Sequence, residues 1–298
     1  MPRLSEDKVD DGINTNAAVE DSGQTIGQYR ACSHIFDGLH STIYKSQYET
    51  GALVALKVTT PHLLGPPHNA HREAQLLRRA ASEKVIPLLE TFNIDGGRFI
   101  LVFPYKKHDF EVLLRRGLLT APQTRSVLRD MFSALVSIHE SGIVHRDIKP
   151  SNILLDSPNG PACLADFGIA WRDGSIEAEA ADKKITDVGT TCYRPPEILF
   201  GFKGYGSALD LWAAGCVVAE AVTVGHEQLF DSGPVGSDLA LIQSIFTTLG
   251  TPDEQTWPVR FSFCSILSLE SFLTSIGNCA TPRLGKDRVF QIPGQALG

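Results

Sequence analysis

Two short motifs carry the residue types of phosphoryl transfer at a spacing that this chemistry can use. The first is His145–Asn152, which reads H-R-D-I-K-P-S-N, and the second is Asp166–Gly168, which reads D-F-G. A hydroxyl that attacks the γ-phosphoryl group of ATP needs a carboxylate to accept its proton, and Asp147 is placed for this role. Lys149 can neutralise charge on the transferred group. An isolated aspartate would be read as a surface carboxylate, but eight matched residues followed by D-F-G argue against coincidence.

Oxygen donors for a metal ion lie in the same two motifs. Phosphoryl transfer from ATP also requires magnesium, which is held against the phosphates. The amide oxygen of Asn152 and the carboxylate of Asp166 are hard ligands of the kind that Mg²⁺ prefers. The sequence therefore predicts ATP and Mg²⁺ as cofactors, with these two residues as the metal ligands.

The motifs resemble the catalytic loop and the metal-binding turn of eukaryotic protein kinases, and within this family the chain looks like the cyclin-dependent kinase branch. Val54–Lys57, which reads V-A-L-K, is similar to the strand whose lysine binds the α and β phosphates, so Lys57 is the expected phosphate lysine. Pro67–Glu73 is similar to the helix signature of that branch. The resemblance implies that Glu73 pairs with Lys57.

Three later segments extend the resemblance. They are Asp187–Leu199 at the end of an activation segment, Asp210–Cys216 on the buried helix that anchors the catalytic loop, and Leu249–Pro258, which is close to the branch's own sequence. Within the first segment, Glu197 takes the place of the glutamate of the A-P-E motif. The resemblance runs from Tyr29 to Pro258.

Periodicity divides the chain into a strand-rich part and a helical part. Alternating β-branched runs predict strands over 29–35, 42–48, 53–59, 88–93 and 98–103, with one helix over 69–80. The clearest later helix begins at Thr120, which forms a capping box with Gln123. An apolar stripe follows this start and predicts a core-facing side. The stripe consists of Val127, Leu128, Met131, Leu135 and Ile138.

This division predicts the α+β class, and the resemblance implies a bilobal protein kinase fold. A small β-rich lobe with one main helix is predicted over 27–105, and a mainly helical, incomplete lobe over 106–258. Residues 1–26 are acidic and polar, with too few apolar groups to offset chain entropy, and are predicted to be disordered. Residues 259–298 are predicted to be an atypical tail without a family match.

The resemblance also implies a nucleotide site with a hinge at Phe103–Lys106. Adenine needs backbone donors and acceptors from an extended segment between apolar walls. The residues implied to contact the nucleotide are Ile35, Gly38, Ile43, Ala55, Lys57, Glu73, Phe103, Tyr105, Lys106, Asp109 and Leu154. Asp109 aligns with a position that contacts ribose, but a carboxylate that begins a helix is equally well explained by the helix dipole.

The loop that covers the phosphates departs from its family pattern. Three glycines are expected, yet Phe36–Ile43 keeps only the middle one, Gly38. Glycines let a backbone approach phosphates closely, so Phe36 and Ser41 should reshape this cover and weaken ATP binding without abolishing activity. Such a loop resembles that of the single-subunit fungal kinases that activate cyclin-dependent kinases, and the whole chain is similar to that group.

The C-terminal end is a second departure. Kinases of this branch continue with helices that complete the large lobe and supply an arginine for the buried glutamate matched by Glu197. Here the Ser- and Leu-rich residues 259–298 match nothing in the family, which suggests a truncated or alternatively spliced product. No motif around Arg260, Arg283 or Arg288 indicates that one of them replaces this arginine. The alternative is a diverged ending that still packs.

Regulation is expected to differ from that of the branch. Arg146 precedes the catalytic aspartate, and such an arginine commonly binds a phosphate on the activation segment. Ile185 stands at the position of the family's phosphothreonine, with Thr186 one residue later. We expect full activation without phosphorylation of Thr186. Cyclin binding is doubtful, because His71 replaces an apolar anchor in the helix signature.

Substrate choice is only partly encoded. Gly189 and Arg194 lie where the branch selects the residue after the target hydroxyl. Glycine can adopt a positive φ without strain, so the backbone that shapes a proline pocket stays accessible. Proline-directed specificity is permitted by these residues but does not follow from them.

Composition agrees with an intracellular enzyme of 298 residues but would not have identified one, and we expect a monomer. The formal net charge of −7 argues against a nucleic-acid partner, which needs clustered Lys and Arg. Six cysteines without paired spacing indicate reduced thiols in the cytoplasm or nucleus. The N-terminus is acidic and polar, so we expect no secretion signal there. The best membrane candidate, Leu211–Val224, is short and contains Glu220, so no membrane partner is expected.

Two functions from different classes follow. The first is a serine/threonine protein kinase whose protein substrates include, in the finer hypothesis, cyclin-dependent kinases. The second is a catalytically impaired relative that acts as a scaffold or binding protein, as the degenerate loop and the unusual ending suggest. The sequence favours the first, because every residue of the expected catalytic set is present. That set is Lys57, Glu73, Asp147, Asn152 and Asp166.

Overall fold

The computed structural model describes residues 23–48 and 50–251, which belong to two compact units. The first unit contains residues up to 65 together with 87–106, and the second contains 66–86 and the chain from 107 onward. The first is a β-sheet and the second is mainly helical, so the predicted α+β class is confirmed. Within the described ranges, no helix is both long and apolar enough to cross a bilayer.

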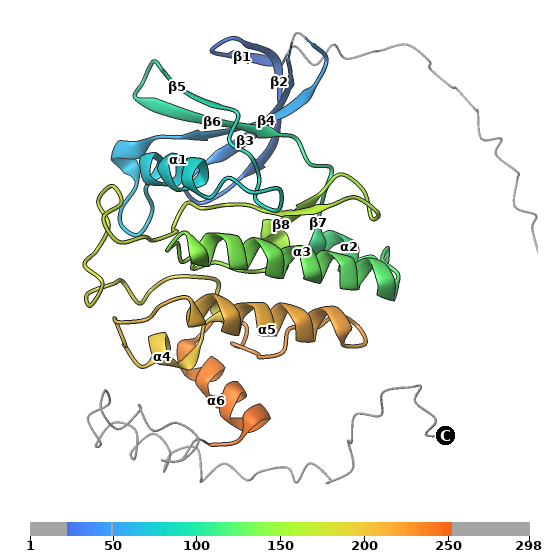
Figure 1. Cartoon of the computed structure of the whole chain (residues 1–298), viewed down its shortest axis with the longest axis vertical. Coiled ribbons are helices and arrows are strands. Elements are labelled where there is room, and N and C mark those ends of the chain that lie inside the picture. Colours follow the sequence, from blue (N-terminus) through green and yellow to red (C-terminus); the bar gives the residue numbers. More distant parts are fainter. Residues whose placement is uncertain (1–22, 49, 252–298) are drawn as a thin grey trace, which may run out of the picture. The chain divides into compact units, whose positions relative to one another are not determined.

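The first unit is a six-stranded antiparallel sheet with the strand order β1-β2-β3-β4-β6-β5 (Figure 1). Its strands are β1 (Gln24–Ile26), β2 (Tyr29–Asp37), β3 (Thr42–Gln47), β4 (Leu53–Thr59), β5 (Glu90–Ile94) and β6 (Arg98–Pro104), with a 3₁₀ turn at Pro61–Leu63. The five predicted strands are all present, and their ends differ by at most two residues. Alternation of apolar and polar residues was therefore a sufficient signal here.

The neighbouring strands β4 and β6 share one buried face; on the other face Ala55 and Lys57 of β4 are half-buried, whereas Leu101 of β6 is fully buried. Val54 and Leu56 of β4 pack with Ile100 and Val102 of β6 in the core of this unit. Successive side chains of a strand point to opposite faces, so the residues between them lie on the other side of the sheet. That second face carries the predicted nucleotide residues of β4.

The predicted disordered segment ends earlier than we expected. Residues 24–26, which we had placed in it, form β1 and pair with β2. The reason is burial: the side chain of Ile26 is 3% exposed and packs in the same core as Tyr29. One apolar residue at a sheet edge was too weak a signal in an otherwise polar sequence. Residues 1–22 lie outside the described ranges.

The second unit contains the remaining helices and a three-stranded antiparallel sheet with the order β7-β8-β9. Its strands are β7 (His108–Asp109), β8 (Ile153–Leu155) and β9 (Ala162–Leu164). Its helices are α1 (Ala70–Arg79), α2 (Phe110–Arg115), α3 (Ala121–Glu140), α4 (Pro196–Leu199), α5 (Ala208–Val222) and α6 (Asp238–Leu249), with 3₁₀ turns at Pro150–Asn152 and Thr191–Tyr193. In Figure 1, α3 and α5 run side by side and contact each other.

The longest helix, α3, forms for the reasons that its sequence indicates. Gln123 accepts a hydrogen bond from the backbone N–H of Thr120 at 2.8 Å, which confirms the predicted capping box. The predicted apolar stripe is buried, apart from Leu128, which is half-buried. Gly142 follows the helix with a φ of 73°, a conformation that glycine adopts without strain. The helix thus presents one face to the core, beside α5 and β9.

Candidate active site

Asp210 of α5 fixes the loop that contains the predicted catalytic residues. Its carboxylate is fully buried and accepts the backbone N–H groups of His145 at 2.8 Å and Arg146 at 2.9 Å. His139 of α3 lies 2.8 Å from the same carboxylate. Arg146 has a φ of 72°, which is strained for any residue with a side chain. Bonds to a charged acceptor are strong enough to hold this strain, and they confirm the anchoring role predicted for the segment Asp210–Cys216.

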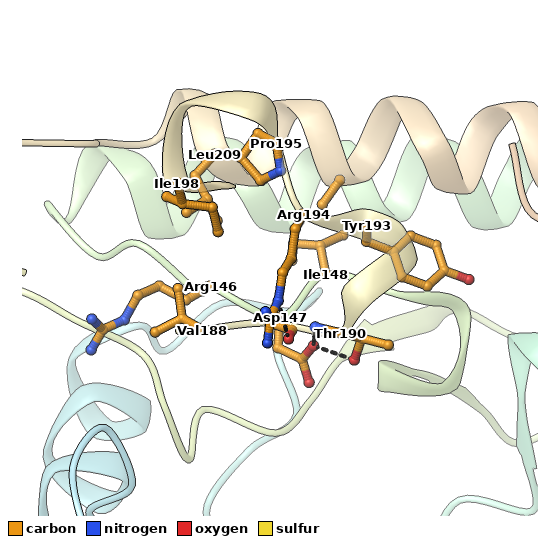
Figure 2. A pocket seen from close by; sticks show the side chains of 12 residues that line it. Arg146, Asp147, Ile148, Val188, Thr190, Tyr193, Arg194, Pro195, Ile198 and Leu209 are labelled. Carbon is orange, nitrogen blue, oxygen red and sulfur yellow. Dashed lines mark hydrogen bonds between the residues drawn. The ribbon is translucent and has the colours of Figure 1, made fainter. Parts of the chain in front are cut away.

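Asp147 lies at the centre of a small polar cluster (Figure 2). Its Oδ1 accepts the backbone N–H and the hydroxyl of Thr190, at 3.0 and 2.8 Å. Its Oδ2 lies 2.9 Å from Nζ of Lys149 and accepts Nδ2 of Asn152 at 3.1 Å. Lys149 also donates to the Thr190 hydroxyl at 2.8 Å. The structure therefore brings both predicted catalytic residues together with one predicted metal ligand.

Thr190 is a member of this cluster that the sequence analysis did not single out. It lies inside the segment Asp187–Leu199, which we had matched to the end of an activation segment. Its position directly after Gly189 was a usable signal. Gly189 is the one glycine of this segment, so it is the residue at which the backbone can most easily turn and bring the next side chain toward the catalytic loop. The missing information was the contact itself, which joins residues 43 positions apart.

A small cavity of about 10 Å³ opens beside the cluster, close to the room that one water molecule needs. Asp147, Thr190 and Arg194 contribute to its lining, with apolar walls from Val188 and Leu209 (Figure 2). The catalytic carboxylate thus borders an apolar recess on one side. Asp147 remains 12% exposed, so a hydroxyl can reach it.

The hairpin of β8 and β9 brings the two predicted metal ligands to one end of a strand pair. The backbone N–H of Ala165 donates to the carbonyl of Asn152 at 2.9 Å, and Asp166 is the next residue. The amide N–H groups of Asn152 donate to Asp147, and among the described residues no hydrogen bond reaches its amide oxygen, which is therefore available as a metal ligand. An amide oxygen and a carboxylate at one hairpin end fit Mg²⁺, which commonly binds one or two protein oxygens together with phosphates.

The D-F-G turn is held from inside the same unit. Phe167 is fully buried, and its ring meets that of His145 edge-on with centroids 4.7 Å apart. The His145 ring lies 3.0 Å from the Ala165 carbonyl through Nε2. Asp166 adopts a φ of 64°, which aspartate tolerates better than most residues. The turn and the catalytic loop are therefore one packed structure.

Four of the predicted nucleotide residues share one face of the first unit's sheet. Lys57 lies opposite Ile43 of β3, and Ala55 lies opposite Phe103 of β6. Directly opposite residues of antiparallel strands project to the same side, as do residues two apart on one strand. Ile35 lies on β2 beside a register shift, and Gly38 lies in the turn after it, where its N–H donates to the Ser41 carbonyl at 2.8 Å.

Tyr105 of the predicted hinge makes two contacts within the first unit. Tyr105 donates its backbone N–H to the Leu53 carbonyl at 3.1 Å, so this donor is already engaged. The ring of Tyr105 lies beneath Nζ of Lys45, 4.8 Å from its centroid. Lys106 is the last residue of the first unit and is half-buried.

Three further predicted nucleotide residues lie in the second unit. Asp109 and Leu154 are directly opposite each other in the β7–β8 pair. Asp109 also caps α2, because it accepts the backbone N–H of Val112 at 2.8 Å, which agrees with the helix-start explanation for this carboxylate. Glu73 lies on α1 with 2% of its surface exposed.

Gly189 and Arg194 form a turn close to the catalytic loop. Gly189 has a φ of 77°, and its carbonyl accepts Nε of Arg194 at 3.1 Å. A side chain at this position would place its Cβ 2.7 Å from the carbonyl oxygen of Arg146. Two independent reasons, the backbone conformation and the close approach, therefore require glycine here.

Glu197 is the acidic residue that the family pairs with an arginine. Burial raises the pKa of its carboxyl above the ordinary value near 4.5. Within the part of the chain that the structure describes, no side chain pairs with this carboxyl. The three arginines we considered as partners, Arg260, Arg283 and Arg288, lie outside the described residues, as does the predicted tail.

Comparison with known proteins agrees with this geometry. The family model of the protein kinase domain matches residues 29–268, which extends beyond Pro258, where we expected the resemblance to stop. The chain is 33% identical over 239 residues to cyclin-dependent kinase 20 of Danio rerio, covering 78% of this chain and 67% of that protein. It is 34% identical over 253 residues to cyclin-dependent kinase 7 of Xenopus laevis, with 82% and 69% covered.

A plant relative gives the same result. Cyclin-dependent kinase D-1 of Oryza sativa subsp. indica is 33% identical over 263 residues, which is 84% of this chain and 59% of that protein. A match of this extent, together with the sheet unit, the helical unit and the geometry around Asp147, establishes the family. The chain belongs to the protein kinase family and is a serine/threonine protein kinase similar to the cyclin-dependent kinases.

Proposed function

We propose that the chain transfers the γ-phosphoryl group of ATP to serine and threonine hydroxyls of protein substrates, with Asp147 as the residue that accepts the hydroxyl proton. One observation carries the proposal: the Asp147 carboxylate is held by Thr190, Lys149 and Asn152, yet remains partly exposed. A carboxylate fixed in this way can orient a hydroxyl without reorganising at the moment of reaction. Lys149 supplies a positive charge 2.9 Å away for the transferred group.

The remaining roles are assigned from the resemblance and fit the local structure. Protein kinases use ATP and Mg²⁺. Magnesium neutralises charge on the phosphates when it is bound, and we assign its protein ligands to Asn152 and Asp166. Lys57 is the proposed phosphate lysine, and its face of the sheet, with Ile43, Ala55 and Phe103, offers apolar contacts suited to adenine. Asp109 is assigned to ribose in addition to its observed capping bond.

The turn at Gly189 supports a preference for proline after the target hydroxyl. In the family this turn meets the residue that follows the hydroxyl. Here Arg194 already occupies the Gly189 carbonyl. That carbonyl is therefore a poorer acceptor for the backbone N–H of a substrate residue, whose desolvation would be only partly offset, whereas proline has no N–H to satisfy. Peptide pairs that differ only as Ser-Pro and Ser-Ala test this, and equal kcat/KM values would contradict it.

Cyclin-dependent kinases are the finer substrate hypothesis, and the chain is proposed to act on them without a cyclin of its own. The signature helix α1 is held inside the second unit by its own contacts: Asn69 caps it and Lys84 just beyond it pairs with Asp130 at 3.0 Å. His71 lies on the exposed face of α1, where its hydration costs nothing. The test mixes recombinant chain, free of cyclin, with a purified cyclin-dependent kinase that has been made inactive by substitution. Phosphorylation of this substrate is expected, and its absence would contradict the hypothesis.

The direct test of the enzymatic function is transfer of radiolabel from [γ-³²P]ATP to a serine/threonine peptide library. Purified chain should label serine and threonine, and Asp147→Asn should not. Label equal to that of Asp147→Asn would leave the scaffold function as the conclusion. Asp166→Asn should abolish magnesium-dependent nucleotide binding in calorimetry, and unchanged binding would remove the metal assignment.

A further inference from the structure

The activation segment, which runs from the D-F-G motif at Asp166 to Leu199, carries a carboxylate that lies between two buried arginines. Oε1 of Glu179 is 3.0 Å from Nη1 of Arg146, and Oε2 is 3.8 Å from Nη1 of Arg72. The side chains of Arg146 and Arg72 are 0% and 3% exposed, and that of Glu179 is 15% exposed. A guanidinium removed from water needs a nearby anion and hydrogen-bond acceptors. Glu179 supplies both to the catalytic-loop arginine.

The two arginines need this carboxylate because they also act on each other. Burial and then the charge of Arg146 lower the pKa of Arg72, while Glu179 and Glu177 oppose this effect. Burial works against ionisation of Glu179 too, but the hydrogen bond and the charge of Arg146, with the charge of Arg72, leave the pKa of Glu179 below its ordinary value. Removal of the carboxylate would leave two like charges buried side by side, which is strongly unfavourable.

The residues just before Glu179 are held in place by specific hydrogen bonds. The side chain of Asn69, which precedes α1, donates to Oε2 of Glu177 at 2.7 Å, and Arg72 donates to the Glu177 carbonyl at 3.1 Å. The backbone N–H of Ile176 donates to Oε1 of Gln75 on α1 at 3.0 Å. Glu177 has a φ of 50°, a strained conformation that these bonds hold in place. The side chains of Asn69, Arg72 and Gln75 thus position the residues that lead into Glu179.

Arg146 connects Glu179 to the catalytic loop. Its Nε donates to the Ile169 carbonyl at 2.6 Å and its Nη1 to the Tyr205 hydroxyl at 3.0 Å, while its backbone N–H is held by Asp210. Asp147 is the next residue. The conformation of the catalytic carboxylate is therefore coupled to the carboxylate of Glu179 through one fully buried side chain.

The usual anion for such an arginine is a phosphorylated hydroxyl on the activation segment. At the position where the family carries that hydroxyl, this chain has Ile185, which packs against the apolar cluster of Ile169, Val188 and Tyr205. The Ile185 carbonyl accepts the Tyr205 hydroxyl at 2.5 Å. An apolar residue in this place cannot be phosphorylated, and the arginine is already paired.

We propose that Glu179 is a positioning residue that takes the place of an activating phosphate: its carboxylate binds Arg146 and Arg72 and keeps the catalytic loop and the activation segment in the working arrangement without modification. The proposal rests on the kinase activity proposed above. It predicts a kinase that is active as synthesised, because its active conformation depends on a carboxylate and not on a phosphate group that a phosphatase could remove.

The test uses full-length chain treated with a broad-specificity phosphatase and shown by intact mass to carry no phosphate. We expect its kcat to be within twofold of that of untreated chain. Glu179→Gln, which keeps the shape but loses the charge, should lower kcat about 10- to 100-fold and leave the dissociation constant for ATP within threefold. Glu179→Asp, which keeps the charge, should recover part of the loss. Asp182→Asn is the matched control, since it removes an exposed carboxylate three residues away.

A second readout separates positioning from general destabilisation. Brief proteolysis should cut Glu179→Gln faster within 173–187 than the parent chain, at a temperature where both remain folded by circular dichroism. The proposal is overturned if dephosphorylation lowers kcat tenfold and rephosphorylation restores it, or if Glu179→Gln and Asp182→Asn behave alike in kcat and cleavage. If the parent chain transfers no phosphate in any state, the proposed function fails, and cleavage alone then decides whether Glu179 anchors the segment.

Discussion

Both hydrogen-bond donors of Thr190 bind one oxygen of Asp147, the backbone N–H at 3.0 Å and the hydroxyl at 2.8 Å. Lys149 binds the same hydroxyl at 2.8 Å, so Thr190 connects the two predicted catalytic side chains. The activation segment and the catalytic loop are therefore coupled at the carboxylate that we propose as the proton acceptor. A substitution in one of these two segments is therefore expected to alter the conformation of the other.

Thr190→Ala should lower kcat about 10- to 100-fold with little change in the affinity for ATP, because the Asp147 carboxylate loses one of its fixed donors. Thr190→Ser keeps the hydroxyl and should retain most of the activity. Steady-state kinetics on the two variants measure the effect. Equal rates for Thr190→Ala and Thr190→Ser would show that the hydroxyl does not position the carboxylate.

Asp210→Asn should destabilise the second unit by about 1.5–3 kcal/mol, since charge-assisted bonds to two buried backbone N–H groups are weakened. Phosphate transfer should fall with it, because Arg146 loses the bond that holds its strained backbone. Urea unfolding and the transfer assay report the two effects. Asp231→Asn is the control: its carboxylate also accepts a backbone N–H, but in an exposed loop, so a change within about 0.5 kcal/mol is expected.

Gly189→Ala should be more damaging than Gly174→Ala, although both glycines have a positive φ, of 77° and 69°. The backbone strain alone costs about 1–2 kcal/mol at either site. At Gly189 the new Cβ would also lie 2.7 Å from the Arg146 carbonyl oxygen, whereas at Gly174 it would meet no atom within 4 Å among the described residues. Urea midpoints of the two variants should differ accordingly, and equal midpoints would contradict the close approach at Gly189.

Glu197→Gln should stabilise the chain increasingly as the pH rises. Burial raises the pKa of Glu197 in the folded state above the ordinary value near 4.5. The folded state therefore binds a proton that the unfolded state releases, and stability that is full below the ordinary pKa is lost as the pH rises through the raised one. Glutamine does not titrate. The difference in melting temperature between the variant and the parent should thus grow from pH 5 to pH 8, and a constant difference would show that Glu197 does not titrate in this range.

The parts of this structure that the sequence predicted are those with local signals. Strand alternation predicts β2 to β6, and the capping box at Thr120 depends on a residue three positions away. The residue types of the proposed catalytic set are dictated by the chemistry, and the structure brings Asp147, Lys149 and Asn152 of this proposal together. β1 was missed because a single buried residue, Ile26, carries it.

Glu179 could not be assigned in advance for a different reason. Glu179 contacts Arg72 at a separation of more than a hundred positions, and its place depends on a left-handed residue at Glu177 that no propensity favours. A lone glutamate in an acidic loop gives no periodic signal. Such contacts follow from the packing of the activation segment on α1, which only the three-dimensional structure supplies.

The most direct test of the central claim is a single-turnover measurement on Asp147→Asn, paired with its dissociation constant for ATP and Mg²⁺. If Asp147 accepts the proton and does not bind the nucleotide, affinity should stay within threefold of the parent value while the rate of phosphate transfer falls about 10²- to 10⁴-fold. A variant that binds ATP normally and transfers phosphate at close to the parent rate would contradict the assignment of Asp147 as the catalytic base.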